Sequence, residues 1–166
     1  HKASGNPEKI AHYIGMTRLM RARWYYEQVK WYNTLPWYSH ALTDTDMEML
    51  YKPRDSRELV VDSIMADLDY ASANVSVDMG NRTIMSRWYA LATQARICLH
   101  EGTYRKYHDE LNLQSTATRF LEKAVEAASK VMESGLFEID KTGGADVAYQ
   151  RLFTGYSLEQ SKEIIL

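Results

Sequence analysis

Apolar residues recur along most of the chain at intervals of three and four, the spacing of amphipathic helices, and this pattern predicts four helical segments. The first runs from Glu8 to Tyr32 and ends there because the residue before Pro36 is driven out of the helical region. The second begins at Asp55, where Glu58 completes a pair that resembles a capping box. Its apolar stripe is made of Val60, Ile64, Leu68, Ala71 and Val75.

Two further helices are expected in the second half of the chain. The third begins at Ser86, a favourable N-cap, and ends at Gly102, a residue type common just past a helix C-terminus. The fourth occupies residues 116–134 and is closed by Gly135. Residues 104–115 are expected to mix frayed helix and loop. The remainder is expected to be loop, including Gly143, Gly144 and Gly155.

The composition agrees with one compact domain. Of the 166 residues, 45% are hydrophobic and only 3 are Pro and 8 Gly, which favours long helices over a sandwich or barrel with frequent turns. The net charge is -2 with both signs interspersed, so no basic field exists to hold a phosphate backbone and nucleic acid is not expected as a partner. The single cysteine, Cys98, excludes an internal disulfide and a CxxC metal site.

The four segments form two helical hairpins with small residues at their crossings, which suggests a tetratricopeptide-like α-α superhelix. Trp88, Leu91, Ala92 and Ala95 loosely match the first half of the tetratricopeptide repeat. We therefore expect an all-α fold, a tetratricopeptide-like α-α superhelix with long loops, forming a single domain over residues 1–166.

A longer pattern is more specific. Residues 15–36, GMTRLMRARWYYEQVKWYNTLP, resemble the helix of the SusD/RagB family that reads GEARFLRAYYYFDLVRLYGDVP. Residues 54–69 resemble the family segment RSxxExVYDxIIxDLD, and residues 86–104 resemble its TK followed by ALALLARVYLYAGxY. Segments 124–135 and 152–165 continue in the same order. The occurrence of these blocks in the same order makes the resemblance much stronger than any one of them would.

The resemblance implies a surface-exposed lipoprotein of the outer membrane that binds oligosaccharides and catalyses nothing. Such proteins sit as a lid on a SusC-like TonB-dependent transporter and need no cofactor. Met16 stands where the family usually has an acidic residue, and Asn33 where it has glycine, but neither departure affects the expected fold. Family members are usually much longer and carry a lipid anchor on an N-terminal cysteine. We therefore expect an N-terminal-half fragment, incomplete at both ends, whose lipid anchor is not in this chain.

Aromatic residues are the candidates for sugar binding, since their faces stack on the apolar faces of sugar rings. Trp37 and Tyr38 follow Pro36 in an expected loop, where exposed aromatics more often bind ligands, and they are the candidate ligand-binding residues. Trp24 and Trp31 are seven residues apart and share a helix face, a spacing that favours a place in the core between helices. Trp88 is expected in the core as well.

Other constellations favour solvated polar surface over metal binding or catalysis. His100 and His108 are eight residues apart, so the helical HExxH geometry is missing. Asp44 and Asp46 begin like a calcium loop that lacks the turn glycine and closing glutamate. No catalytic residue and no metal ligand is therefore assigned. Two rival functions stay open: a tetratricopeptide-type module that binds a protein or peptide, and a helical glycan hydrolase, which would need two facing carboxylates.

Overall fold

The computed structural model describes residues 5–78, 82–155 and 161–166, and within these ranges the chain is all-α. The expected fold class is therefore confirmed. The α-helices are α1 (Pro7–Tyr32), α2 (Met47–Leu50), α3 (Arg57–Asn74), α4 (Arg87–Tyr107), α5 (Ala117–Glu133) and α6 (Ala145–Thr154), with 3-10 turns η1 (Asp109–Leu111) and η2 (Gln114–Thr116) between α4 and α5. The helices belong to two compact units, His1–Ala73 and Asn74–Leu166, which are described in turn.

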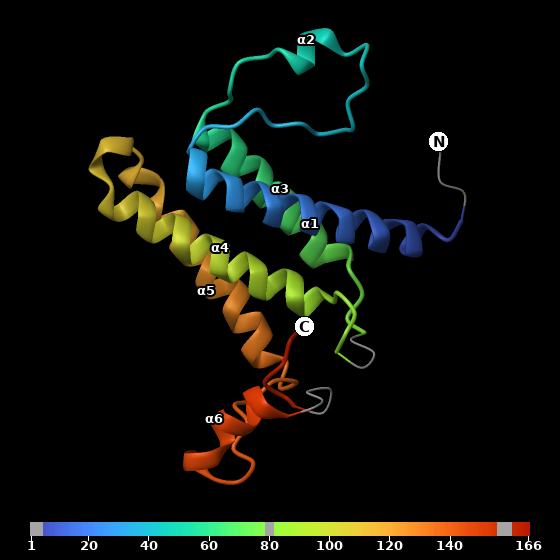
Figure 1. The fold of residues 1–166 in the computed structure, drawn as a ribbon, viewed down its shortest axis with the longest axis vertical. Coiled ribbons are helices and arrows are strands. Elements are labelled where there is room, and N and C mark those ends of the chain that lie inside the picture. The colour runs from blue at the N-terminus through green and yellow to red at the C-terminus, as the bar shows by residue number, and fades with distance from the viewer. Residues whose placement is uncertain (1–4, 79–81, 156–160) are drawn as a thin grey trace. The chain divides into compact units, whose positions relative to one another are not determined.

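In the first unit, α1 and α3 pack as an antiparallel pair (Figure 1). Arg57, at the start of α3, donates hydrogen bonds to Val29 and Asn33 at the end of α1, at 3.4 and 3.1 Å. Asp67, farther along α3, pairs with Arg21 in the middle of α1. Their facing sides are buried, and the predicted stripe is confirmed on α3: Val60, Ile64, Leu68 and Ala71 are each 0% exposed. Val75, predicted as its last member, follows the end of the helix and is also 0% exposed.

The start of α3 differs from the predicted capping box. The helix begins at Arg57, and the hydroxyl of Ser56 accepts the hydrogen bond from the N–H of Leu59, at 3.3 Å. The carboxylate of Asp55 instead accepts the backbone N–H of Trp37 at 2.7 Å. Asp55 was a wrong choice of cap because its side chain serves a contact with a distant segment, which a local sequence motif cannot reveal.

In the second unit, α4 and α5 lie side by side (Figure 1). Ser86 caps α4 as predicted, accepting a hydrogen bond from the N–H of Tyr89 at 3.4 Å. Leu91, Ala127 and Val131 form a buried cluster between the helices, and further apolar residues pack against it: Trp88, Ala95, Phe137 and Ile165. The expected place of Trp88 in the core is confirmed in part, since it packs against this cluster but is half-buried. Helix α5 matches its predicted range to within one residue at each end.

Gly102 does not end α4, which continues through it to Tyr107. A Cβ atom at position 102 would lie 2.7 Å from Cδ2 of Leu121 and 3.1 Å from the backbone oxygen of Ala117. The glycine therefore permits close approach of α5, and this role, which depends on the partner helix, was mistaken for a helix stop.

Another wrong expectation concerns residues 145–154, which form α6 and not loop. The helix follows Gly144, whose φ of 87° lies in the left-handed region that glycine tolerates. Tyr149 and Phe153, one turn apart, bring their rings to 4.9 Å between centroids. Only ten residues long, α6 has too few turns for its periodicity to stand out among the flanking glycines.

Trp24 and Trp31 are not in the core: their exposed fractions are 61% and 81%. The seven-residue spacing does place them on one face, but it is the face opposite the buried side of α1, which carries Leu19, Ala22 and Val29. Helix α1 has an apolar stripe on each side, and periodicity alone does not say which of two stripes faces the neighbouring helix. The outer stripe is called the α1 aromatic face below and consists of Tyr13, Met20, Trp24 and Trp31.

We expect Gly102→Ala to lower the free energy of unfolding by about 1 kcal/mol, measured by urea denaturation. The helix propensity of alanine favours the substitution by about 1 kcal/mol, but overpacking against Leu121 and Ala117 costs about 1 to 3 kcal/mol. Adding Leu121→Ala should remove much of the clash, so the two effects will not be additive. A gain in stability from the single substitution would show that the helices are not in close contact at this point.

Candidate functional site

The predicted aromatic loop connects α1 to α3 and is closed at its base. The backbone N–H of Asp55 donates to the carbonyl of Leu35 at 3.0 Å, in an isolated antiparallel bridge. This bridge brings the two ends of the loop together, so that residues 36–54 form one excursion from the helix pair. Trp37 and Tyr38 lie just inside its first end, and Lys52 lies just inside its second.

Trp37 is held against α1 by two side chains. The ring of the buried Tyr25 lies 4.5 Å from the Trp37 ring, centroid to centroid, and the guanidinium carbon of Arg21 lies 4.9 Å from it. The hydroxyl of Tyr25 also donates to the carbonyl of Pro36 at 3.3 Å and accepts the N–H of Tyr38 at 3.1 Å. Tyr25 therefore fixes both the ring of Trp37 and the backbone on either side of it.

Arg21 ties the loop to both helices through three hydrogen bonds. Its Nε and one terminal nitrogen donate to the two carboxylate oxygens of Asp67 at 2.7 and 2.8 Å, and its other terminal nitrogen donates to the carbonyl of Ser39 at 2.6 Å. Asp67 is 3% exposed. The hydrogen bond to Asp67 and the negative charge of Asp67 raise the pKa of the Arg21 guanidinium by more than its partial burial lowers it, so Arg21 stays charged.

Lys52 and Asp55 hold the same loop from its other end. The ammonium of Lys52 donates to the carbonyl of Trp37 at 2.7 Å and to Oδ2 of Asp55 at 2.6 Å, and it lies 5.0 Å from the centroid of the Tyr38 ring. The hydroxyl of Tyr38 donates to the carbonyl of Met49 at 3.2 Å. Desolvation raises the pKa of Asp55, but the hydrogen bonds from Lys52 and Trp37 and the charge of Lys52 lower it by more, so the net shift is downward.

The structure thus brings the two predicted residues, Trp37 and Tyr38, into one cluster, where both are half-buried. It also adds residues that the sequence did not single out as site residues: Arg21, Tyr25, Lys52 and Asp55. Arg21 carried a signal, since it lies in the segment 15–36 at a position where the family pattern also has arginine. Tyr25, Lys52 and Asp55 carried no such signal, because their contacts are with loop residues whose positions no sequence periodicity predicts.

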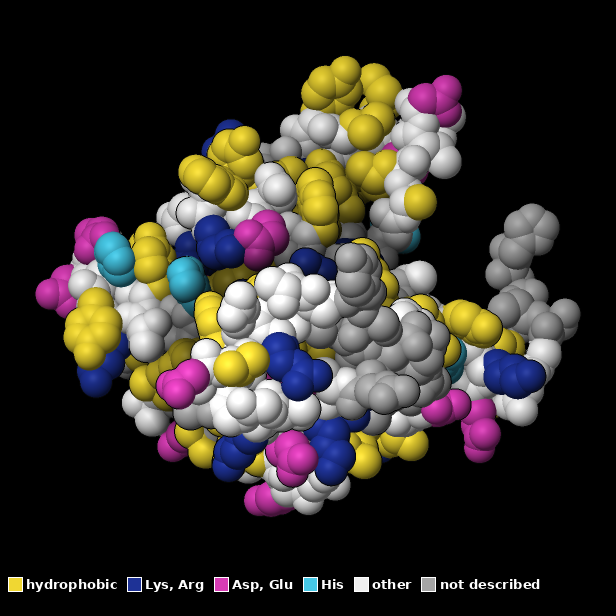
Figure 2. All heavy atoms as spheres, turned by 60° about the horizontal axis from the view of Figure 1, so that its bottom comes forward, with side chains coloured by type: hydrophobic (Ala, Val, Ile, Leu, Met, Phe, Trp, Pro, Cys, Tyr) yellow, Lys and Arg dark blue, Asp and Glu magenta, His cyan; other side chains and the backbone are white. Residues whose placement is uncertain are grey.

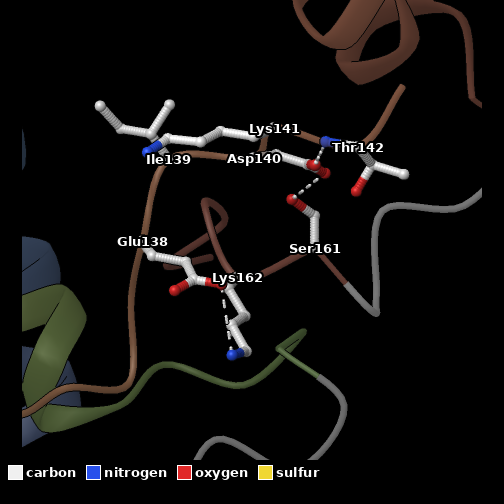
Figure 3. A pocket seen from close by; sticks show the side chains of 7 residues that line it. All are labelled: Glu138, Ile139, Asp140, Lys141, Thr142, Ser161 and Lys162. Carbon is white, nitrogen blue, oxygen red and sulfur yellow. Dashed lines mark hydrogen bonds and ion pairs between the residues drawn. The ribbon is translucent and has the colours of Figure 1, made fainter. Parts of the chain in front are cut away.

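A polar hollow of about 630 Å³ lies in the second unit (Figure 3). Its described lining residues are Glu138, Ile139, Asp140, Lys141, Thr142, Ser161 and Lys162. Asp140 accepts hydrogen bonds from the N–H of Thr142 at 2.8 Å and from the hydroxyl of Ser161 at 3.3 Å, which lower the pKa of its carboxyl. Lys162 pairs with Glu138 at 3.3 Å. None of these lining residues has an aromatic ring on which a sugar could stack, so the hollow is a weaker candidate for sugar binding than the aromatic loop.

Metal-ligand geometry does not occur within residues 5–78, 82–155 and 161–166, where no three His, Cys, Asp or Glu side chains converge on one point. His100 and His108 instead flank the ring of Tyr104, with centroids 5.9 and 4.1 Å away. None of the helices in those same ranges is long and apolar enough to cross a membrane. Acidic and basic side chains are interspersed over the face seen in Figure 2.

Comparison with known proteins supports the fold. No family model matches the sequence, and no curated protein matches it either. Among solved structures, the chain is similar to the crystal structure of a SusD-like protein from Bacteroides fragilis, with a TM-score of 0.75 and 22% sequence identity. The match covers 99% of this chain but 28% of that one. The resemblance to SusD-like proteins drawn from the sequence is therefore confirmed at the level of the fold.

We expect Asp67→Asn to lower the free energy of unfolding by about 2 to 3 kcal/mol, because it leaves the charge of Arg21 without its buried partner. Asp69→Asn, two residues farther on and exposed, is the matched control and should change stability by less than about 0.5 kcal/mol. Urea denaturation of both variants makes the comparison. Equal effects at the two positions would contradict the central role given to the Arg21–Asp67 pair.

The contact between Asp55 and Trp37 should survive mild acid. A carboxyl whose pKa is lowered by folding contributes stability above its unfolded value of about 3.9 and loses it as the pH falls through the lower folded value. The NMR signal of the Trp37 backbone amide should therefore stay unchanged between pH 7 and about pH 5 and shift only below about pH 4. In Asp55→Asn this acid shift should be absent, whereas a transition above pH 5 in the wild type would contradict the assignment.

Proposed function

We propose that the chain belongs to a SusD-like outer-membrane lipoprotein of the SusD/RagB family, which binds oligosaccharides for nutrient uptake and catalyses no reaction. The observation that carries this proposal is the likeness to a SusD-like protein over 99% of the chain, together with the ordered sequence blocks between residues 15 and 166. In the same proposal, the two units are parts of a single SusD-like helical domain.

Trp37 and Tyr38 are the ligand-binding residues in this proposal. Their loop is held in one conformation by Tyr25, Arg21 and Lys52, which reduces the entropic cost of binding a ligand there. The aromatic rings would offer apolar surface to a sugar, with charged and backbone groups beside them for its hydroxyls. Packing of Trp37 against Tyr25 and Arg21 makes it the anchor of the site, with the half-buried Tyr38 beside it.

Binding without catalysis fits the electrostatics of this loop. A general acid at neutral pH needs a raised pKa, and glycoside hydrolysis needs such an acid opposite a second carboxylate. The pKa of Asp55 is lowered, and Asp67 is engaged on both oxygens by Arg21. The carboxylates near Trp37 therefore suit positioning and hydrogen bonding better than proton transfer.

The proposed partner is a SusC-like TonB-dependent transporter, and the proposed location is the cell surface, through a lipid anchor in the outer membrane. One observation favours a second candidate, a tetratricopeptide-type protein-interaction module. The α1 aromatic face exposes large apolar side chains along one side of a helix, as surfaces that bind other proteins often do.

Isolation of the protein from its native host separates the two candidates. We expect it in the outer-membrane fraction, and we expect mass spectrometry of the purified material to identify a TonB-dependent transporter that co-purifies with it. A soluble periplasmic protein taken through the same purification is the control for non-specific recovery. Recovery from the cytosol with soluble protein partners would contradict the uptake role and favour the interaction module.

A further inference from the structure

Asp55 has one carboxylate oxygen engaged and one available. Oδ2 accepts hydrogen bonds from the N–H of Trp37 and from Lys52, at 2.7 and 2.6 Å. Within the described ranges of the chain, Oδ1 accepts none. Both oxygens of a carboxylate can accept hydrogen bonds. Because the two bonds to Oδ2 hold the carboxylate in place, Oδ1 is an acceptor in a fixed position. The lowered pKa of Asp55 keeps it ionised, and therefore an acceptor, at neutral pH.

Lys52 complements this acceptor with a donor. An ammonium group has three N–H bonds, and in the described part of the structure two of them are directed to the carbonyl of Trp37 and to Asp55. The third is available for a hydroxyl oxygen. The side chains of Lys52 and Asp55 are 20% and 22% exposed, so a ligand can reach them while most of each group is sheltered from water.

The available donor and acceptor lie beside an aromatic ring. The ammonium of Lys52 is 5.0 Å from the centroid of the Tyr38 ring. Because the same ammonium donates a hydrogen bond to Oδ2 of Asp55 at 2.6 Å, the carboxylate is also close to that ring. A sugar ring presents an apolar face bordered by hydroxyl groups, each both donor and acceptor. The ion pair also has no net charge, which favours a neutral polyhydroxyl ligand over a phosphate or a carboxylate.

From this geometry we infer that Lys52 and Asp55 form the hydrogen-bonding half of the sugar site and together bind two adjacent hydroxyl groups of a neutral oligosaccharide next to Tyr38. Lys52 donates to one hydroxyl oxygen, and Oδ1 of Asp55 accepts the proton of its neighbour. The inference rests on the proposed function and deepens it, since it names the ligand as a neutral sugar with a free vicinal diol.

Binding measurements by isothermal titration calorimetry with maltohexaose and cellohexaose, whose units keep the adjacent 2- and 3-hydroxyls free, test this inference. For whichever probe the wild-type protein binds, we expect Lys52→Met and Asp55→Asn each to weaken binding at least tenfold, and Tyr38→Ala to weaken it as well. The matched controls are Lys30→Met and Glu27→Gln, which alter an ion pair of the same three-residue spacing on α1. These should leave the affinity unchanged, and circular dichroism should show all variants to be folded.

A second ligand separates recognition of the diol from support of the loop. When the vicinal hydroxyls of the bound probe are methylated, the wild type should bind weakly, and Lys52→Met should bind no worse than the wild type. If Lys52 and Asp55 only stabilise the loop, their substitution will weaken binding of both ligands equally, and the inference is wrong. It is also wrong if only Tyr38→Ala has an effect, although the proposed function then stands. No binding of any probe by the wild type would contradict the proposed function itself.

Discussion

The first unit depends on the buried carboxylate of Asp67 and the guanidinium of Arg21 that neutralises it. An ionised carboxylate at 3% exposure is tolerated only when its charge is matched, and Arg21 matches it through two parallel hydrogen bonds. The same guanidinium reaches the carbonyl of Ser39 and lies against the ring of Trp37. One charge thus joins α1 to α3 and sets the conformation of the loop between them.

A second ion pair repeats this arrangement with less burial. Lys52 and Asp55 close the far end of the loop, and both contact the backbone of Trp37. The loop is therefore bracketed by the ion pairs Arg21–Asp67 and Lys52–Asp55, with aromatic rings between them, and Arg18 also lies 3.9 Å from Asp67. Such a surface has fixed donors and acceptors, and the Lys52–Asp55 pair at one end of the loop is neutral as a whole. That end suits a ligand that is polar and uncharged, as sugars are.

Most of the fold could be predicted from the sequence, because helices α1, α3, α4 and α5 each carry a full apolar stripe, although the start of α3 and the end of α4 were predicted wrongly. Two of the errors share a cause, which is that the deciding contact lies far away in the sequence. Asp55 bonds to Trp37 and leaves the cap to Ser56. Gly102 is needed by α5 and not by a helix terminus. The position after Pro36 was enough to select Trp37 and Tyr38 as candidates, but it could not identify the side chains that contact them.

Adjacent residues on α1 show why aromatic composition alone does not identify a binding site. Tyr25 is 8% exposed and makes two hydrogen bonds through its hydroxyl, whereas Trp24, one position earlier and about 100° around the helix, is 61% exposed. The α1 aromatic face has apolar rings, and the polar groups near it include the Glu27–Lys30 ion pair. A sugar needs a ring and fixed hydrogen-bonding groups together. The loop provides both around Tyr38, so it is the better candidate for a glycan, and the α1 aromatic face is better suited to packing against protein.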